Sequence, residues 1–505
     1  MLFNSYEFIF LFLPIAFFGF FSVARKSNRM AALWLACASL FFYGWWNPQY
    51  VVLLLASIGF NYAMGYSIGH VGKRRDGRDH RTKYLLTIAI GVNLLLLGYF
   101  KYTNFFIGTS NDFLGTKWEL AQIILPLGIS FFTFTQVAFL VDVYRGIARE
   151  YSFTHYILFV SYFPHLIAGP VLHHRQMMPQ FALPETYHLN LENVSIGLAY
   201  FSIGLAKKVL LADSLSEYAT PVFAAAGKGG EMMFFSSWVG VIAYSFQLYF
   251  DFSGYSDMAV GLSKIFGVDL PRNFNSPYKA RNVIEFWKRW HMTLSQFLRD
   301  YLYISLGGNR HGQFRRYTNL MLTMLLGGFW HGASWNFVVW GALHGAYLII
   351  NHVWRSFVGE SSSRIITAAG IVLTYLAVTV AWTFFRADTL SAALEIVKGM
   401  AGINGISLPI SLFWVEPHAA NLPFAVRFEG LSPELATPVA ATPIIFWFSI
   451  SSIIIWLLPN SQELVSRLLV ERLGSRRMVG TLFGCLFGAS VLSFSRVSEF
   501  LYFQF

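Results

Sequence analysis

Long runs of apolar residues recur along the whole 505-residue chain and limit its possible folds more than any other feature. Several of them approach the ~20 residues that an α-helix needs to cross ~30 Å of hydrocarbon. With 55% hydrophobic and 12% charged residues, the chain has too little polar surface to cover a soluble protein of this length. We therefore expect an all-α integral membrane protein with roughly ten to twelve transmembrane helices, plus re-entrant and interfacial helices. The main runs are 7–24, 30–46, 50–68, 84–100, 120–141, 365–385, 444–458 and 479–492.

The basic residues gather in short connections between these runs. The positive-inside rule explains the formal charge of +11 without a nucleic-acid partner. The connection 387–442 carries five acidic residues against two basic ones, so we expect it on the outer side of the cell membrane. No basic residue precedes the first run, which predicts a retained helix with its amino end outside. We expect a bacterial inner membrane protein with both termini in the periplasm. The expected cytosolic connections are 25–29, 73–83, 145–149, 272–316 and 467–477.

The chain reads as one membrane domain, 1–505, with its catalytic core at about 160–345. In that core, polar residues, Pro and Gly interrupt apolar segments, and polar groups at membrane depth commonly mark function. The segment 161–174 holds two prolines, which predicts a bent or re-entrant path. The segment 245–257 places Asp251 and Asp257 among aromatic residues, where they cap and join helices or line a site. The connection 387–442 holds five prolines and is predicted to be an external loop.

The segment 284–303 is the most informative part of the core. A helical projection places its charged residues within one arc and its tryptophans opposite, which predicts an amphipathic helix at the membrane surface. His291 falls on the apolar side, where a neutral imidazole can donate, accept or shuttle a proton. The polar arc contains Glu285, Lys288, Arg289, Gln296, Arg299 and Asp300.

His331 follows an apolar run that begins near residue 317, so a helix of about fourteen residues climbs ~21 Å from the cytosolic side. An ionisable residue at that depth, followed by Gly332, is a functional candidate. The alternative is a core histidine bonded to a carbonyl. His344 and His165 fit that structural role better. Cys37 and Cys485 lie far apart in apolar runs, and we expect neither a disulfide nor a metal site.

Three enzyme or transporter patterns are absent from the sequence. No histidine has Asp five positions later, the segment 225–230 lacks the first glycine and the Ser/Thr of a P-loop, and there is no G-x-S-x-G nucleophile elbow. ATP-driven transport therefore loses its main sequence support. If the reaction uses an acyl-serine intermediate, we expect a partner protein to supply the serine.

Several long motifs resemble the membrane-bound O-acyltransferase (MBOAT) family, and within it the bacterial alginate O-acetyltransferase branch. They are F-N-S-P-Y (274–278), E-F-W-K-R-W-H (285–291), L-R-D-Y-L-Y-I-S-L-G-G-N-R (298–310) and G-G-F-W-H-G-A-S-W (327–335). The resemblance implies the multi-pass MBOAT fold, with His331 as the catalytic histidine and His291 as the second histidine. It also implies an acyl donor that enters from the cytosol and an acceptor on the outer side.

The leading hypothesis is an O-acetyltransferase that moves acetyl from acetyl-CoA to alginate or another exported polysaccharide. Transfer is direct or passes through a periplasmic esterase-like partner, next to the polysaccharide export machinery. The alternatives are D-alanyl transfer from a carrier protein to a cell-wall polymer, and a transporter or export scaffold without catalysis. His331 suits the general base, since the acceptor hydroxyl must lose its proton. The candidates for donor binding are Asn309, Arg299, Trp330 and Asp257.

Overall fold

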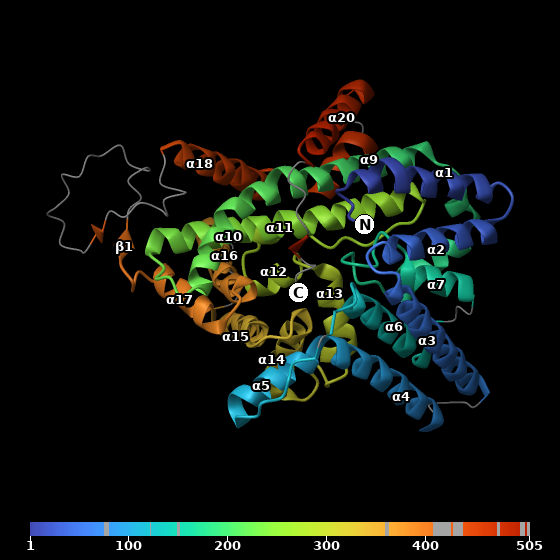
Figure 1. Cartoon of the computed structure of the whole chain (residues 1–505), viewed down its shortest axis with the longest axis horizontal. Helices are drawn as coiled ribbons and strands as arrows, with labels where there is room; N and C mark the ends of the chain where they lie inside the picture. Colours follow the sequence, from blue (N-terminus) through green and yellow to red (C-terminus); the bar gives the residue numbers. More distant parts are fainter. Residues whose placement is uncertain are drawn as a thin grey trace.

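The computed structural model describes the chain except residues 75–79, 122, 149–151, 359–362, 408–425, 428–437, 472–474, 495–499 and 502–505. Within the described ranges the regular elements are helices, apart from one pair of two-residue strands (Figure 1). The expected all-α class is therefore confirmed. The predicted cytosolic connection 73–83 and the external connection 387–442 fall partly outside the described residues.

The helices before residue 230 are α1 (Leu13–Ala24), α2 (Asn28–Gly44), α3 (Gln49–Arg74), α4 (His80–Leu97), α5 (Thr103–Leu114), α6 (Ile129–Tyr144), α7 (Phe153–Ser161), α8 (His174–Met177), α9 (Leu191–Ala206) and α10 (Asp213–Gly227). Wider π-helical turns extend some of them: η1 (Glu7–Phe12), η2 (Gly98–Tyr102) and η5 (Lys207–Ala212). Two short 3₁₀ turns, η3 (Met178–Ala182) and η4 (Pro184–Tyr187), follow α8.

The later helices are α11 (Phe234–Ile265), α12 (Val283–Trp287), α13 (Met292–Phe297), α14 (Gly312–His331), α15 (Trp335–Val358), α16 (Arg364–Arg386), α17 (Leu390–Met400), α18 (Pro438–Ser452), α19 (Ser461–Val465) and α20 (Arg476–Leu492). The short turns among them are η6 (Pro277–Lys279), η7 (Leu298–Tyr303), η9 (Ile453–Leu457) and η10 (Ser466–Val470). The strands β1 (Ile406–Ser407) and β2 (Val426–Arg427) pair in parallel.

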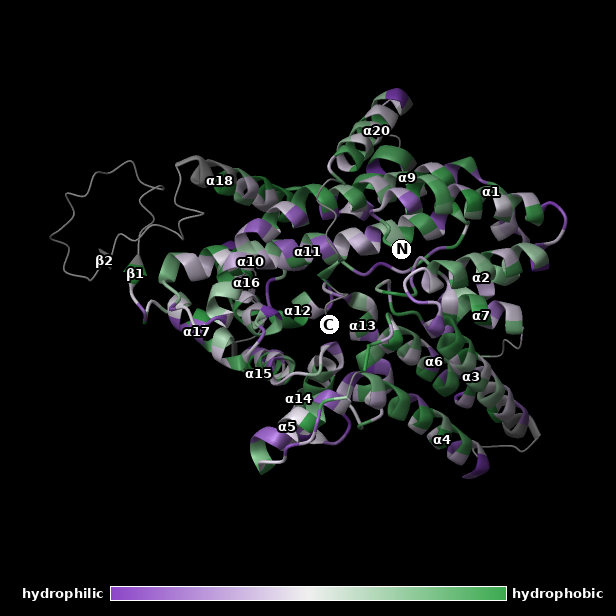
Figure 2. Cartoon of the chain, in the orientation of Figure 1, coloured by the Kyte–Doolittle hydropathy of each residue, from purple (hydrophilic) through white to green (hydrophobic). Residues whose placement is uncertain are grey.

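Six helical segments of the described chain are long and apolar enough to cross a membrane. A seventh crossing results if the pair Ile444–Leu457 and Ser461–Leu469, bent by 72°, forms one span. Figure 2 shows apolar residues along these helices and polar residues at several helix ends and turns. The six segments are Glu7–Ala24, Gln49–His70, His80–Leu114, Leu191–Gly227, Trp335–Phe357 and Arg364–Arg386. The count of roughly ten to twelve crossings stays a prediction.

The predicted cytosolic connection 25–29 and the described ends of 73–83 lie at the opposite end of the molecule from the first part of the external connection 387–442, whereas the predicted cytosolic connection 272–316 runs through its middle. The turn between α1 and α2, with the end of α3 and the start of α4, lies at the right of Figure 1, whereas α17 and β1 lie at the left. This separation is what opposite membrane sides require. The assignment of the right end to the cytosol stays a prediction.

Helix α11 is the buried centre of the fold, and it packs most closely against α9. Two pairs of glycines stand opposite each other in this contact, Gly197 with Gly261 and Gly204 with Gly254. A Cβ on Gly204 would meet the carbonyl oxygen of Gly254 at 2.5 Å, so no larger residue fits there. Small residues that let two backbones approach are a common basis of helix association in membranes.

The carboxylates predicted in the 245–257 segment find partners across the same helix contact. Lys208 of η5 lies 2.7 Å from Asp251, and Lys207 lies 2.7 Å from Asp257. Asp257 also accepts a hydrogen bond from Ser461 Oγ at 2.6 Å. These side chains, together with Asp213, form a buried cluster that we call the lysine–aspartate cluster. The cluster joins η5, α10, α11 and α19.

Both ends of the described chain pack on the same residue of α11. The ring of Phe3 stacks on Tyr255 with 4.9 Å between the ring centroids, and Phe500 meets Tyr255 edge to face at the same distance. The backbone N–H of Leu501 donates to Asp251. Residues near both termini are therefore part of the protein core, and their membrane side stays a prediction.

The segment 161–174 is confirmed as a break in the helical structure, because residues 162–173 form buried turns between α7 and α8. The prediction that 387–442 is a loop throughout is wrong in its first part, where α17 forms, and in its last residues, where α18 begins at Pro438. Thr389 caps α17 by accepting a hydrogen bond from the backbone N–H of Ala392. The prolines on which the prediction rested begin only at Pro409, well beyond the end of α17.

Candidate active site

His331 is the last residue of α14, and its surroundings explain why the helix ends there. Gly332 has an extended backbone, with φ −160° and ψ 152°. A Cβ at this position would run into the Phe337 ring, so only glycine lets the chain turn so close to that ring. The imidazole therefore stands at a fixed helix end, and His331 is only 7% exposed.

Aromatic rings surround the His331 imidazole. The ring centroids of Trp330, Trp340 and Phe385 lie 4.9, 5.1 and 5.2 Å from that of His331, and all three rings meet it edge to face. These neighbours come from α14, α15 and α16. A charge that develops in such a water-poor setting interacts strongly with nearby dipoles.

The second histidine sits at a strained point of the backbone. His291 has φ 42°, in the left-handed region, and its side chain is fully buried. For a residue with a Cβ this conformation costs on the order of 1–3 kcal/mol and persists only where the surroundings impose it. Strain of this kind is concentrated at functional sites.

Asn273 imposes that conformation and also sets the tautomer of His291. Its Oδ1 accepts from the Thr293 backbone N–H and lies 3.0 Å from His291 Nδ1. Because a backbone N–H can only donate, this amide oxygen is an acceptor, so Nδ1 of His291 carries the proton. Nε2 then presents its lone pair, which can accept a proton or a hydrogen bond.

The prediction of one amphipathic surface helix over 284–303 is wrong. The structure has α12, a break at 288–291, then α13 and η7. Trp287 and Trp290 are 8% and 4% exposed, so they belong to the core and are not at headgroup level. Hydrogen bonds to residues 273–275, including Met292 N–H to the Asn273 carbonyl, replace those that the helix loses at the break.

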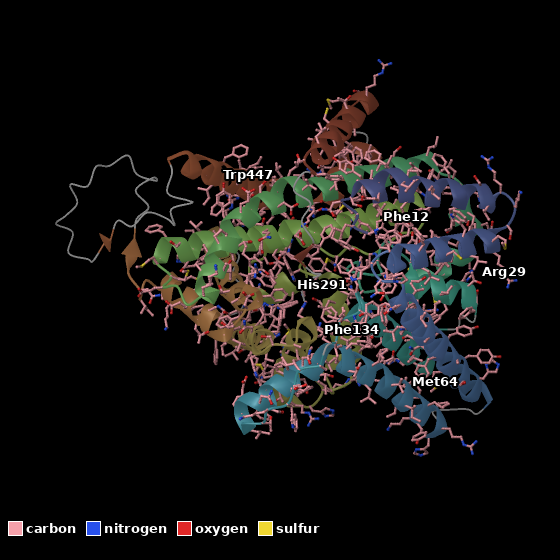
Figure 3. The ribbon with its side chains drawn as sticks, viewed as in Figure 1. Phe12, Arg29, Met64, Phe134, His291 and Trp447 are labelled. Carbon is pink, nitrogen blue, oxygen red and sulfur yellow. The ribbon has the colours of Figure 1, made fainter. Side chains whose placement is uncertain are left out.

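One aromatic cluster lies beside all three buried histidines, His331, His291 and His344. The Trp340 ring packs against His331 and His344, with centroids 5.1 and 4.7 Å apart, and stacks on Trp382. Trp382 in turn packs against Trp290, the residue before His291, at 4.9 Å. His344 is fully buried, and its Nδ1 accepts a hydrogen bond from Trp287 Nε1. Figure 3 shows His291 in the middle of the molecule, below α11, with Phe134 nearby.

A stack of aromatic rings connects the two histidine-bearing segments. Phe134 of α6 stacks on Phe297 of α13 at 4.4 Å and on Trp330 of α14 at 5.0 Å between ring centroids. Trp330, a predicted donor-binding residue, is therefore one of the aromatic residues around His331. We call these residues, Trp330, Trp340 and Phe385, together with His331, the His331 pocket.

The other predicted donor-binding residues lie elsewhere. Arg299 and Asn309 are exposed, and Arg299 pairs with the neighbouring Asp300 at 2.7 Å. Asp257 belongs to the lysine–aspartate cluster, where Lys207 and Ser461 occupy its carboxylate. Within the described residues, no group of three His, Cys, Asp or Glu side chains could hold a metal ion.

Two parts of the site escaped the sequence reasoning. Asn273 lies 18 residues before the histidine that it holds, and no local pattern connects them. Lys101 Nζ donates to the backbone carbonyls of Trp330 and His331, at 2.7 and 2.9 Å. Its signal was a single lysine directly after the apolar run 84–100, which was read as the end of a membrane span.

Several known proteins are similar to this chain in sequence. The sequence model of the membrane-bound O-acyltransferase family matches residues 85–390, which include His291, His331 and Lys101. The chain is 43% identical to the peptidoglycan O-acetyltransferase of Helicobacter pylori over 435 residues, 81% of each chain. It is 42% identical to the probable alginate O-acetylase AlgI of Azotobacter vinelandii over 407 residues, 79% of this chain and 78% of the relative.

A more distant similarity covers less of the chain. The teichoic acid D-alanyltransferase of Streptococcus thermophilus is 31% identical over 237 residues, 45% of this chain and 57% of the relative. The matched residues, the identity to these relatives and the helical membrane fold lead to one conclusion: the chain belongs to the membrane-bound O-acyltransferase family.

Proposed function

We propose that the protein is a membrane O-acetyltransferase that moves an acetyl group from acetyl-CoA to a hydroxyl of an exported polysaccharide. The observation that carries the proposal is the burial of His331 and His291 among aromatic rings in a chain that is 43% identical to an O-acetyltransferase over 81% of its length. The identity to the D-alanyltransferase relative extends over 45% of the chain, which favours acetyl over D-alanyl transfer.

In the proposed reaction the acceptor hydroxyl loses its proton to a ring nitrogen of His331 as its oxygen attacks the thioester carbonyl. The new C–O bond forms, the C–S bond breaks, and the leaving thiolate takes the proton from the imidazolium. His291 orients the acceptor hydroxyl, because the lone pair of its Nε2 accepts a hydrogen bond. The burial of both rings supports this role, because fixed hydrogen-bonding groups act most strongly where water is excluded.

The relatives differ in the polysaccharide that their names give. Two of them, with nearly equal identity of 43% and 42%, carry the names of peptidoglycan and alginate enzymes. We propose an exported polysaccharide as the acceptor class, reached directly or through a periplasmic partner. We also propose that the protein lies in the bacterial inner membrane, with the donor on the cytosolic side.

The test uses the purified full chain in nanodiscs with acetyl-labelled acetyl-CoA and separate samples of alginate and peptidoglycan fragments. His331→Gln should lose transfer by ~10²–10⁴-fold and keep donor binding, since a missing general base affects the transition state. The exposed His188 gives the matched control, and His188→Gln should keep full activity. Full transfer by His331→Gln would remove the mechanism, and transfer of D-alanyl from a carrier protein in place of acetyl would replace the reaction.

A further inference from the structure

Lys101 is an unusual residue for a membrane helix, because its amine lies against the end of the helix that carries His331. It belongs to η2, inside the apolar segment His80–Leu114. η2 is a π-helical turn, and such turns often occur at functional sites. Among the described residues, no carboxylate pairs with the Lys101 amine, which contacts Ser130 Oγ at 3.3 Å and the carbonyl oxygens of Trp330 and His331.

The donor count of the amine matches these contacts. An ammonium group has three N–H donors and no acceptor, and the three oxygen atoms around Lys101 Nζ are all acceptors. The negative end of the α14 dipole also favours a cation there. The site thus satisfies the N–H donors of a lysine amine in a span where a buried polar group without partners is costly.

Neighbouring Tyr102 completes the contact with α14. The last four carbonyls of a helix have no partner within the helix. In α14, Tyr102 Oη donates to the Phe329 carbonyl at 2.8 Å, and Lys101 donates to the next two. The Tyr102 ring stacks on Phe329 at 4.3 Å. Figure 1 shows α5, which follows η2, beside α14.

We propose that Lys101 is a positioning residue of the transfer reaction, which holds the main chain of Trp330 and His331 so that the imidazole stays aligned with both substrates. The proposal rests on the proposed function, in which His331 is the base. Helix ends fray when their carbonyls lack partners. A displacement of ~1 Å at a reacting group can lower the rate by ~10²-fold. Loss of the Lys101 contacts therefore affects the chemical step.

Three variants of Lys101 separate charge, hydrogen bonding and bulk, all in the full chain in nanodiscs. Lys101→Met removes the donors and keeps the length of the side chain. It should lower kcat at least ~10-fold. KM for acetyl-CoA should change less than ~2-fold, because the residues that bind acetyl-CoA are unchanged. Lys101→Gln restores a neutral donor and should recover part of kcat, and Lys101→Arg should recover more. Tyr102→Phe removes only the Phe329 bond and should have the smallest effect.

A second measurement reports the position of the imidazole directly. With ¹⁵N-labelled histidine, the His331 resonance should broaden or split in Lys101→Met, whereas the His291 resonance should stay as in the wild type. An unchanged His331 resonance with wild-type kcat in Lys101→Met would overturn the proposal. If Lys101→Met fails to fold, equal kcat of Lys101→Gln, Lys101→Arg and the wild type would overturn it instead.

The parallel His331→Gln measurement distinguishes this proposal from the proposed function. Full transfer by His331→Gln removes the base mechanism and with it the role of Lys101. Loss of transfer by His331→Gln, together with wild-type kcat in Lys101→Met, removes the role of Lys101 alone.

Discussion

The lysine–aspartate cluster and the His331 pocket use buried lysines in opposite ways. In the cluster, Lys207 and Lys208 each lie 2.7 Å from an aspartate of α11, so each amine has a carboxylate partner. In the pocket, Lys101 contacts backbone carbonyls and a hydroxyl, and no described carboxylate pairs with it. The comparison teaches that ion pairs fix helices to each other, whereas a buried lysine without a carboxylate beside a histidine points to chemistry.

The largest effect is expected from breaking the cluster. Lys208→Met leaves Asp251 buried without its cation, and removal of one partner of such a pair costs about 3–5 kcal/mol. We expect little folded protein, seen as a lower yield and a lower midpoint of thermal unfolding in detergent.

The double variant Lys208→Met with Asp251→Leu removes both charges of this pair and should recover part of the stability, because Asp213 still lacks its lysine. If Lys208→Met is as stable as the wild type but transfers less acetyl, the cluster takes part in the reaction. The contrast between the cluster and the His331 pocket would then be wrong.

A smaller effect on folding and a clear effect on activity is expected at Asn273. Asn273→Ala removes the acceptor of three hydrogen bonds, one of them to His291, and should release the strained backbone there. Transfer should fall about tenfold or more, because the ring loses its fixed direction. The assay is acetyl transfer by the folded fraction.

Thr293→Val is the matched variant, since it removes one donor to Asn273 and leaves the His291 contact. It should reduce transfer less than Asn273→Ala. Equal losses in both variants would mean that general packing, and not the direction of His291, controls the rate.

The smallest effect is expected at the exposed rim. Arg299→Ala breaks a surface pair with Asp300, and such pairs contribute about 0–1 kcal/mol. If Arg299 attracts the phosphates of the donor, KM for acetyl-CoA should rise up to about fivefold, with kcat unchanged and less effect at high salt. Arg310→Ala, at an exposed arginine of the same connection, is the control. A fall in kcat would instead mean that Arg299 contributes to the chemical step, as is proposed for the residues of the His331 pocket.

Local patterns in the sequence predict the fold class, which the structure confirms, and they single out His331, whose catalytic role stays a prediction. The apolar runs predict helices because every backbone group in lipid must find its partner within the helix. His331 stands out because a histidine at the end of such a run is rare. The paired glycines of α9 and α11 and the partners of Asp251 depend on contacts between distant segments, which no single stretch of sequence contains.

The errors have the same origin. The pattern over 284–303 is truly helical in period, but hydrogen bonds from residues 273–275 break the helix at His291. The prolines after residue 408 led to the prediction of a loop over the residues of α17, although Thr389 is a residue type that caps helices and caps this one. Lys101 looked like the boundary of a span because its acceptors lie about 230 residues further along the chain.

The position of Tyr255 has a consequence for how the protein is made. Phe3 enters the membrane early in synthesis, yet its partner ring is translated some 250 residues later, and Phe500 arrives last of the three. Contacts this distant in sequence form late and slowly. Phe3 therefore lacks its contact with Tyr255 until the chain has been synthesised through α11, and a fusion tag on Met1 would have to fit beside a residue that is 9% exposed in the finished protein.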